Sequence, residues 1–364
     1  MNPAPFRIVR SYFRLPPEPG GMEEHIARLS AEQRRFGLDV MNLFNVGQAE
    51  GANIQLYRGR DLLSVRPAPL RNLLFYAAAM LHTRELRSER PTFLHVHGDW
   101  SDFLLGRVLA RLIGAQGLAA SLHDLVDTSK RSRYRAALRG YDLVFATGRA
   151  DQVFLSGALG RPVHHMPSAP HPDFSRAAPP AAPYRYDVVS VTNLFEKKNP
   201  GLVLDCAARR PDLRFALIGH GDLSGQIAER VRREQLTNVD LRGRLGRAEI
   251  IAALQASRLF LSTAFREGTP TAALEAMAVG LPLVITPSND YDWLVQPGRN
   301  GYVTRSWEVA ELLVHIDGIL ADDRLAAEMA AMNRAAAATR SWQANAARVS
   351  NLMAERLGLA WRAA

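Results

Sequence analysis

Residues 258–286 read RLFLSTAFREGTPTAALEAMAVGLPLVIT, and they decide the fold because they hold a complete strand–helix–strand unit. The apolar run that opens the stretch is typical of a buried strand, and a loop with Glu267 follows it. We expect a helix to begin next, with Thr269 as its N-cap and Pro270 at the first helical position, and to end at Gly280. The second apolar run then predicts a neighbouring parallel strand.

The beginning of this helix is expected to bind an anion. The backbone amides around Thr271 and Ala272 have no acceptor within the helix, and the positive end of the helix dipole lies beside them. Such a helix start suits a phosphate group.

Glu275 lies about one turn further along, between Leu274 and Ala276, too far from the helix start to act as a cap. A carboxylate among small apolar side chains needs hydrogen-bond donors or its pKa shifts, and the hydroxyls of a sugar diol would supply two donors. The alternative is a glutamate that faces solvent on a surface helix.

The same alternation of short apolar runs and longer amphipathic segments extends over the whole chain, which indicates βαβ units on parallel sheets. Strands are expected at residues 6–10, 39–44, 93–97, 118–122 and 142–147, and again at 187–192, 214–219, 239–243, 258–263 and 281–286. Helices in the first half are expected near residues 21–36, 68–88, 101–114, 129–139 and 148–158.

Residues 167–183 interrupt this rhythm with six prolines in 17 positions, a composition that suits neither a helix nor a central strand and predicts a linker. We therefore expect an α/β fold with two Rossmann-like domains that face each other across a cleft at the carboxyl ends of both sheets. The expected boundaries are 1–172 for the N-terminal domain, 173–184 for the hinge, 185–340 for the C-terminal domain and 341–364 for a terminal amphipathic helix.

The composition of the 364 residues, 47% hydrophobic and 22% charged, is that of a globular rather than a disordered protein. The formal net charge of +9 would suit nucleic acid, an anionic membrane or a phosphorylated substrate, and no nucleic-acid-binding motif accompanies it. All but three of the 45 basic residues are arginines; the lysines are Lys130, Lys197 and Lys198. The single cysteine, Cys206, fits a reducing compartment, and we see no signal peptide or membrane span, so a cytoplasmic location is expected.

Glu267 and Glu275 are eight residues apart and precede AMAVGLP, a pattern that resembles the E-x7-E motif of the retaining nucleotide-sugar glycosyltransferases of family 4. The resemblance covers essentially the whole chain. It implies the GT-B architecture, in which the second domain binds the donor, the first lies on the acceptor side, and the C-terminal helix crosses back to the first domain. It also implies that Glu267 contacts the sugar hydroxyls and Glu275 the ribose diol. The donor-binding residues at the helix start are then Gly268, Thr269, Thr271 and Ala272.

Other segments of the second half resemble donor-binding parts of the family. In VTNLFEKKNP, Lys198 falls on a lysine that contacts the donor diphosphate, whereas Asn193 occupies the position of the family's arginine. Lys197 or Arg266 would compensate for that missing guanidinium, and a solvated helix start is the alternative for the lysine pair. LIGHGD resembles the family's G-x-G strand end, and LRGRLGRAE resembles its nucleobase-reading loop. The residues implied there are Gly219, Gly221, Arg244 and Leu245, and Trp342 occupies the position of an aromatic residue before the last helix.

In the first half, PEPGGMEEHI resembles the glycine-rich loop that faces the acceptor and the donor phosphates, with Gly20 and Gly21 as its candidates. ASLHDL places His123 at a strand end, where the family has a histidine near the transferred sugar. His97 ends the preceding strand and could shape the same site. A structural role is the alternative for such histidines, and it is the expected one for His164 and His165.

A short basic helix follows His123 and carries Lys130, Arg131, Arg133, Arg135 and Arg139. It would dock anionic lipid headgroups or an acceptor phosphate, and a solvated helix face is the alternative.

The sequence therefore predicts a retaining, metal-independent glycosyltransferase of the hexosyltransferase type, with His123, Glu267 and Lys198 as catalytic residues. The expected co-substrate is a nucleotide-diphospho-sugar, UDP- or GDP-linked, with no cofactor. The expected acceptor is a glycan or lipid-linked glycan of bacterial cell-surface polysaccharide or lipopolysaccharide, reached peripherally at an anionic membrane and without nucleic acid. Because Asn193 replaces the arginine, a catalytically silent GT-B scaffold or regulatory subunit is the alternative. A nicotinamide-dependent enzyme is disfavoured because no G-x-G-x-x-G follows the first strand, and only the charge suggests a nucleic-acid binder.

Overall fold

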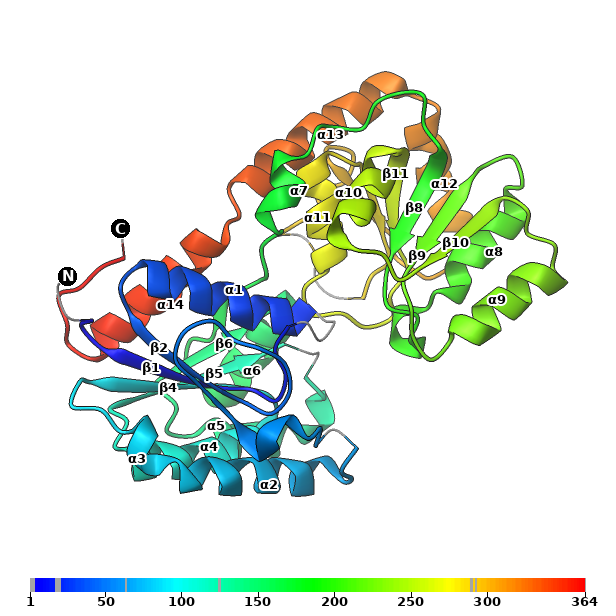
Figure 1. The fold of residues 1–364 in the computed structure, drawn as a ribbon. Helices are drawn as coiled ribbons and strands as arrows, with labels where there is room; N and C mark the ends of the chain where they lie inside the picture. Colours follow the sequence, from blue (N-terminus) through cyan, green and yellow to red (C-terminus); the bar gives the residue numbers. More distant parts are fainter. Residues whose placement is uncertain are drawn as a thin grey trace. The chain divides into compact units, whose positions relative to one another are not determined.

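The computed structural model describes residues 4–16, 21–62, 64–123, 126–288, 291 and 293–363. The chain forms two compact units: residues 1–168 together with 342–364, and residues 169–341. Each unit is a parallel sheet with helices on both faces (Figure 1), which confirms the predicted α/β class with two Rossmann-like domains.

The sheet of the first unit has seven parallel strands within the described residues, in the order β3-β2-β1-β4-β5-β6-β7. Their bounds are β1 (Arg7–Ser11), β2 (Asp39–Phe44), β3 (Asn53–Gln55), β4 (Thr92–His97), β5 (Gly117–Leu122), β6 (Leu143–Ala146) and β7 (His164–His165). The five longer strands lie where the apolar runs predict them. The pattern does not predict β3 or β7, because two or three residues are too few to show a periodicity.

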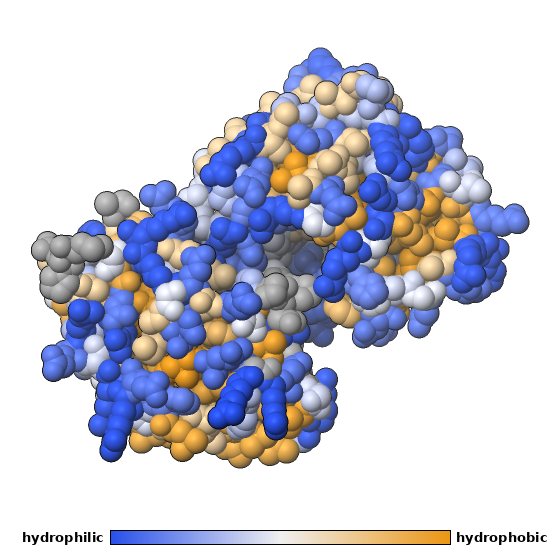
Figure 2. Space-filling model, in the orientation of Figure 1, coloured by the Kyte–Doolittle hydropathy of each residue, from blue (hydrophilic) through white to orange (hydrophobic). Residues whose placement is uncertain are grey.

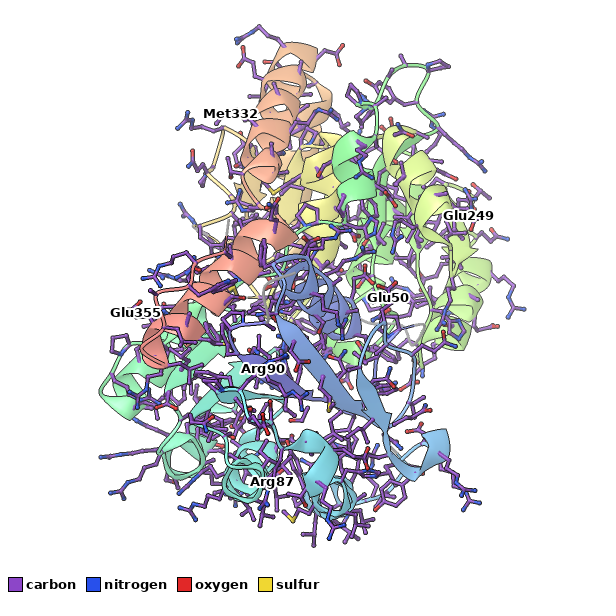
Figure 3. The ribbon with its side chains drawn as sticks, turned by 60° about the vertical axis from the view of Figure 1, so that its left-hand side comes forward. Glu50, Arg87, Arg90, Glu249, Met332 and Glu355 are labelled. Atoms are coloured by element: carbon purple, nitrogen blue, oxygen red, sulfur yellow. The ribbon has the colours of Figure 1, made fainter. Side chains whose placement is uncertain are left out.

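Helices cover both faces of this sheet. One face carries α2 (Ala68–Leu81), α3 (Thr83–Leu86), α4 (Trp100–Ile113), α5 (Arg131–Leu138) and α6 (Arg149–Leu159), with 3-10 turns at Leu56–Gly59 and Thr128–Lys130. The other face carries α1 (Gly21–Arg35) and α14 (Trp342–Arg356), which lie side by side. Glu355 lies on the exposed side of α14, and Arg87, after α3, donates to the Leu112 carbonyl at the end of α4 (Figure 3).

The sheet of the second unit has six parallel strands within the described residues, in the order β10-β9-β8-β11-β12-β13. Their bounds are β8 (Tyr186–Val191), β9 (Phe215–Ile218), β10 (Val239–Gly243), β11 (Ser257–Ser262), β12 (Leu283–Ile285) and β13 (Gly301–Val303). One face packs against α8 (Gly201–Arg209), α9 (Ser224–Arg233) and α12 (Val309–Leu320). The other packs against α7 (Pro172–Arg176), α10 (Arg247–Gln255), α11 (Thr271–Val279) and α13 (Asp323–Ala338). A 3-10 turn, η3 (Glu196–Lys198), follows β8.

The proline-rich segment that the sequence predicts as a linker contains a helix, so the exclusion of helix there is wrong. Pro172 occupies the first position of α7, and the ring of His171 caps it by accepting from the Asp173 amide at 3.2 Å. A proline is tolerated at that position because its missing N–H would have no acceptor within the helix. Phe174 is buried in the second unit, which therefore begins at Ala169, ahead of the expected hinge at 173–184.

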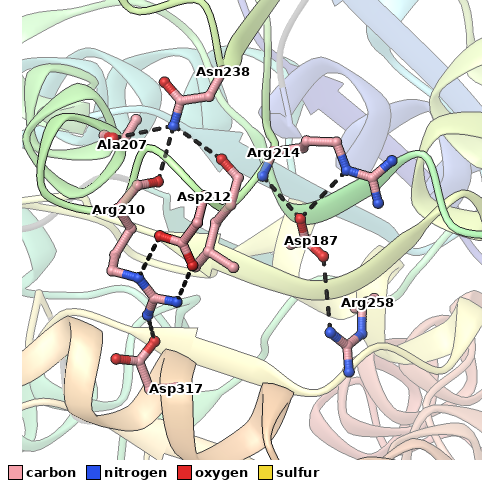
Figure 4. A network of polar contacts seen from close by, with 9 residues as sticks. Asp187, Ala207, Arg210, Asp212, Arg214, Asn238, Arg258 and Asp317 are labelled. Carbon is pink, nitrogen blue, oxygen red and sulfur yellow. Dashed lines mark hydrogen bonds and ion pairs between the residues drawn. The ribbon is translucent and has the colours of Figure 1, made fainter.

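Polar contacts join the amino ends of the strands in the second unit (Figure 4). Asn238, just before β10, donates from Nδ2 to the carbonyls of Ala207, Arg210 and Leu213 at 2.9–3.1 Å. The surrounding ion pairs join Asp187 to Arg214 and Arg258, and Arg210 to Asp212 and Asp317. Ligands of parallel sheets bind at the opposite, carboxyl edge, so this network serves stability.

None of the helices in the described part of the chain is both long enough and apolar enough to cross a bilayer.

We predict that Asn238→Ala lowers the free energy of unfolding by about 2 kcal/mol, because three backbone carbonyls each lose the hydrogen bond from the Asn238 side chain. Thr237→Ala is the control, since that side chain is the exposed neighbour of Asn238. Urea unfolding measures both variants. Equal stability of the two would show that the three contacts do not support the unit.

Candidate functional site

The predicted donor-binding residues of the second unit follow the carboxyl ends of adjacent strands. Arg244 and Leu245 follow β10, Gly219 and Gly221 follow β9, Asn193 and Lys198 follow β8, and Glu267 follows β11. The strand order changes direction between β8 and β11, and ligands of open parallel sheets bind at such a switch point. The loops therefore line one edge of the sheet around the place where a ligand is expected.

Lys198 and Glu267, 69 residues apart in sequence, meet at this edge. Nζ of Lys198 and Oε1 of Glu267 form an ion pair, and the two side chains are only 16% and 15% exposed. The pair joins two of the three residues that the sequence predicts as catalytic.

Backbone hydrogen bonds between the two loops bring these side chains together. The amides of Phe265 and Arg266 donate to the Lys197 carbonyl at 3.0 and 3.2 Å. The Thr263 hydroxyl donates to the Asn199 carbonyl at 2.9 Å. The loop after β11 is thus attached to the turn after β8, independently of the ion pair.

The structure explains why glycine is required at positions 219 and 221, a reason that the sequence does not reveal. A Cβ at Gly219, where φ is +146°, would lie 1.7 Å from the Thr192 carbonyl oxygen, and one at Gly221 would lie 2.6 Å from that of Leu194. The glycines thus allow the loop after β8 to cross closely over the loop after β9. That loop holds Asn193, whose side chain is exposed at the site edge. Contact of the glycines with a nucleotide stays a prediction.

The prediction that Thr269 is the N-cap of α11 is wrong. The helix begins at Thr271 with Pro270 as its N-cap, and no side chain caps it. The Thr271 amide, predicted to be available to an anion, donates to the Thr269 carbonyl at 2.9 Å, because φ of −77° and ψ of 75° at Pro270 form an inverse γ-turn. Leu274 makes the first i to i−4 bond, to Pro270, so the amide of Ala272 still lies ahead of the regular helical bonds.

The other residues predicted to bind the donor differ in how far they are buried. Gly268 is buried and Thr269 half-buried at the start of α11, and Glu275 is half-buried between the buried Leu274 and Ala276. After β10, Arg244 is exposed, while Leu245 packs against the core of the unit.

Tyr291 is a site residue that sequence reasoning missed. It is 2% exposed, and its hydroxyl lies 2.6 Å from the Ser288 hydroxyl in the loop after β12. Burial and the carboxylate of Glu267 raise the pKa of Tyr291, which therefore stays a neutral hydroxyl beside that carboxylate. The available signal was the position of PSNDYDW after a strand end at the same edge.

In the first unit the structure brings His123 and His97 together. His123 follows β5 and His97 ends β4; Nδ1 of His97 lies 2.8 Å from Nε2 of His123, and the rings are stacked. His25 of α1 lies edge-on to His123, with 4.7 Å between ring centroids. Gly21 begins α1, whereas Gly20 lies outside the described residues. His164 and His165, which the sequence predicts to be structural, form β7.

A buried polar chain continues behind these rings. His95 lies two residues before His97 on the same face of β4, with its Nε2 2.8 Å from the Ser121 hydroxyl and its Nδ1 3.5 Å from Nη2 of Arg10. Arg10 is 1% exposed and donates to Oε1 of Gln33 at 2.5 Å. No carboxylate pairs with Arg10 in the described part of the chain.

Burial is the main cause of the altered acidity of this chain. It lowers the pKa of His25, His95 and His97 well below 6.5, and the neighbouring imidazoles and Arg10 lower each of them further. Burial also lowers the pKa of Arg10, to about 9. The three histidines are therefore neutral at pH 7, beside a guanidinium that keeps its charge.

The predicted basic patch lies on α5 and the turn before it, where Arg131, Arg133, Arg135 and Arg139 are exposed. Lys130 instead pairs with Asp127 at 2.9 Å, and the Ser129 hydroxyl and Lys130 lower the pKa of Asp127 to about 2.

Among the described residues no group of three or more His, Cys, Asp or Glu side chains is placed to hold a metal ion.

Comparison with known proteins agrees with this architecture. Residues 19–169 match Glycosyltransferase Family 4, and residues 173–337 match Glycosyl transferases group 1. The putative glycosyltransferase EpsF of Bacillus subtilis is 33% identical over 317 residues, which cover 71% of this chain and 81% of EpsF. Two other curated matches are local, and this chain spans only 32% and 31% of their length.

Solved structures share the fold. The sucrose-phosphate synthase of Thermosynechococcus elongatus has a TM-score of 0.83 at 17% identity and covers 97% of this chain and 99% of its own. HepE of Anabaena, solved with UDP-glucose, has a TM-score of 0.77 at 17% identity, over 96% of this chain and 99% of its own. The protein thus has the two-domain architecture of GT-B glycosyltransferases. It belongs to family 4, the glycosyl transferases of group 1.

The buried histidines predict a loss of stability in mild acid. Their pKa values are lowered by folding, so below about pH 6.5 the unfolded chain binds protons that the folded chain does not. The contribution of these three histidines to the free energy of unfolding should have its full value above pH 6.5 and fall as the pH drops, whereas buried Asp102, with a pKa of about 8, contributes in the opposite direction. Each histidine contributes a slope of about 1.4 kcal/mol per pH unit.

Urea unfolding at several pH values between 7.5 and 5 tests this expectation. His95→Gln should reduce the slope by one histidine's share, whereas Ser121→Ala should lower stability equally at every pH. A slope that His95→Gln leaves unchanged would contradict the assignment.

Proposed function

We propose that the protein is a retaining glycosyltransferase that moves a sugar from a nucleotide-diphospho-sugar to a hydroxyl group of a glycan or lipid-linked glycan. The Lys198–Glu267 ion pair carries this proposal, because it places a cation and a carboxylate at the switch point of the second unit. The donor is a UDP- or GDP-sugar; HepE of the same fold has been solved with UDP and with UDP-glucose. Curated relatives are named for colanic acid and amylovoran biosynthesis, which supports a role in bacterial surface polysaccharide assembly.

The loops after β10, β8 and β11, together with α11, offer a partner to each group of such a donor. The nucleobase lies by Arg244 and Leu245 after β10, and the ribose diol donates to Glu275. The diphosphate lies between Lys198 and the start of α11, and the sugar hydroxyls donate to Glu267. Because the strands are adjacent, one extended ligand can reach all of these loops.

Donor binding then exchanges the partners of the ion pair. The diphosphate takes over Lys198, and the sugar hydroxyls supply donors to Glu267, so neither charge is left without a partner at this poorly exposed position. The pair keeps both side chains in place before the donor arrives.

The chemical step breaks the bond between the anomeric carbon and the diphosphate oxygen, and the electron pair stays on the diphosphate. Lys198 and the amides at the start of α11 stabilise that charge, and no metal ion or other cofactor takes part. The acceptor oxygen bonds to the anomeric carbon from the face that the diphosphate leaves, which retains configuration. The hydroxyl proton passes to the leaving phosphate oxygen, and His123 orients the sugar.

Two substitutions separate the proposed roles. Glu275→Ala should weaken donor binding about 10- to 100-fold with little effect on kcat, because it removes charge-assisted hydrogen bonds made before and during the reaction. Glu267→Ala should chiefly lower kcat, by about 100-fold. Glu328→Ala on the exposed face of α13 is the control. Donor hydrolysis and transfer assays over UDP- and GDP-sugars measure all three, and equal, negligible effects would refute the assignments.

The silent-scaffold alternative rests on Asn193 and has its own test. If the protein only positions other enzymes, Lys198→Ala should leave its cellular function unchanged, and no nucleotide sugar should raise its melting temperature. A thermal-shift screen over nucleotide sugars decides between the two functions.

We further propose that the first unit docks on an anionic membrane to reach a lipid-linked acceptor. The exposed side of α2 carries Leu73 and Leu81, which are 51% and 85% exposed, and the adjacent α4 carries Leu104, Val108 and Leu112. Figure 2 shows hydrophobic side chains along the margin of this unit where Figure 1 places α2. The arginines of α5 lie next to α4. An apolar stripe bordered by cations is typical of a surface that enters the headgroup layer.

Arg135→Glu combined with Arg139→Glu should weaken binding to phosphatidylglycerol vesicles at least about 30-fold, since each cation contributes about 1 kcal/mol. Leu73→Ser combined with Leu81→Ser should weaken it as well, whereas Arg324→Glu on α13 is the matched control. Vesicle co-sedimentation measures binding. Equal binding of all variants would remove the membrane from the proposal and leave the basic helix as a solvated face.

A further inference from the structure

His97 is enclosed in protein and contacts His123, the histidine that the sequence predicts near the transferred sugar. It is 1% exposed, and its Nδ1 lies 2.8 Å from Nε2 of His123. At this distance one ring nitrogen donates a proton and the other accepts it. The second nitrogen of His97, Nε2, is buried and has no hydrogen-bond partner among the described residues.

The buried Nε2 decides the direction of the hydrogen bond. If His123 donated, Nε2 of neutral His97 would carry the hydrogen, and a buried N–H would have no acceptor. If His97 donates from Nδ1, its Nε2 holds only a lone pair, and buried acceptors without a partner are less rare than buried donors without one. The second arrangement is favoured, and it leaves the proton of neutral His123 on Nδ1.

Arg10 and His95 hold the chain behind His97 in one protonation state. A guanidinium only donates, so Nδ1 of His95 accepts from Arg10, and Nε2–H of His95 donates to the Ser121 hydroxyl. The guanidinium has no carboxylate partner in the described ranges, so an imidazolium on His95 or His97 would face an uncompensated cation. Burial and this cation lower the pKa of both histidines.

Ring contacts with two histidines and a backbone hydrogen bond hold His123 in place. The ring stacks on His97 with 5.1 Å between centroids and 21° between planes, and His25 meets it edge-on at 83°. The Thr147 hydroxyl donates to the His123 carbonyl at 3.1 Å, and the Ser168 hydroxyl lies 3.0 Å from Nδ1 of His25. In this position Nε2 of His123 meets Nδ1 of His97, and this hydrogen bond determines which nitrogen of His123 carries the proton.

We propose that His97 is a positioning residue that fixes His123 as the neutral tautomer with its proton on Nδ1. His123 then offers an N–H donor from Nδ1 and cannot donate from Nε2. The consequence for turnover rests on the proposed function, because it requires that His123 orients the transferred sugar. The tautomer itself does not depend on that function.

Proton positions can be read directly in the full-length protein labelled with ¹⁵N-histidine. Long-range ¹H–¹⁵N correlation distinguishes Nδ1–H from Nε2–H, and His123→Asn identifies the signals of His123. We expect the unaltered protein at pH 7.5 to show both His97 and His123 as Nδ1–H. An Nε2–H signal for His123 in that protein would overturn the proposal without any variant.

Two substitutions at His97 test the cause. His97→Asn keeps an N–H close to the position of Nδ1 and should preserve the Nδ1–H tautomer of His123, whereas His97→Leu keeps the volume without a donor and should shift His123 toward Nε2–H. In the transfer assay His97→Leu should lower kcat about 10- to 100-fold with donor KM changed less than about threefold, and His97→Asn should restore most of kcat. An unchanged tautomer in a folded His97→Leu protein would overturn the proposal.

The two readouts separate this inference from the proposed function. If no nucleotide sugar is turned over but the spectra show the expected tautomers, the transferase proposal fails and the positioning of His123 stands. If transfer occurs and His97→Leu changes neither the tautomer nor kcat, the positioning role fails and the transferase proposal stands.

Discussion

Every strand pair in both sheets runs parallel, and this constraint determines where chemistry can occur in the protein. A parallel strand needs a crossover to reach its neighbour, so all loops that leave carboxyl ends collect at one edge of the sheet. In the second unit that edge receives the turns after β8, β9, β10 and β11. Residues that are 50 or more positions apart in sequence, such as Asn193 and Glu267, thereby become neighbours in one row of loops. The opposite edge holds Asn238 and the surrounding ion pairs, and these contacts stabilise the unit.

The second unit positions its charges by backbone contacts rather than by the charges themselves. The Lys197 carbonyl accepts from two amides of the loop after β11, and the Thr263 hydroxyl adds a third contact. These bonds join neutral groups and do not depend on which anion Lys198 faces. In the proposed donor complex the ion pair can therefore open, while the loops that carry Lys198 and Glu267 stay in register. A site that exchanges partners needs such support, because a poorly exposed charge that loses its partner is costly.

The first unit instead contains three neutral histidines, His25, His95 and His97, next to the buried guanidinium of Arg10. Burial of Arg10 without a carboxylate is costly, and the hydrogen bonds to Gln33 and His95 offset only part of that cost. In return, the cation opposes protonation of each of these histidines. His95 and His97 are in ring contact without a hydrogen bond between them, so Arg10 and His95 act on His97 by keeping it neutral. A neutral imidazole has one donor and one acceptor nitrogen, so the proposed hydrogen bond from His97 to His123 has a single direction.

The sequence by itself determined the class of fold and most of the strands and helices, because apolar periodicity depends on residues a few positions apart. It also determined the candidates Glu267, Glu275 and Lys198, through their spacing and their resemblance to a known family. Two predictions from local sequence preference were wrong. The helix α7 forms within a proline-rich segment because Phe174 is buried there, and Pro270 rather than Thr269 is the N-cap of α11. Only the tertiary structure decided the pairing of Lys198 with Glu267, the place of Tyr291 beside that carboxylate, and the chain from Arg10 to His123. Each of these contacts joins residues on different strands or in the loops that follow them, and the register that aligns them arises only when the sheet has assembled.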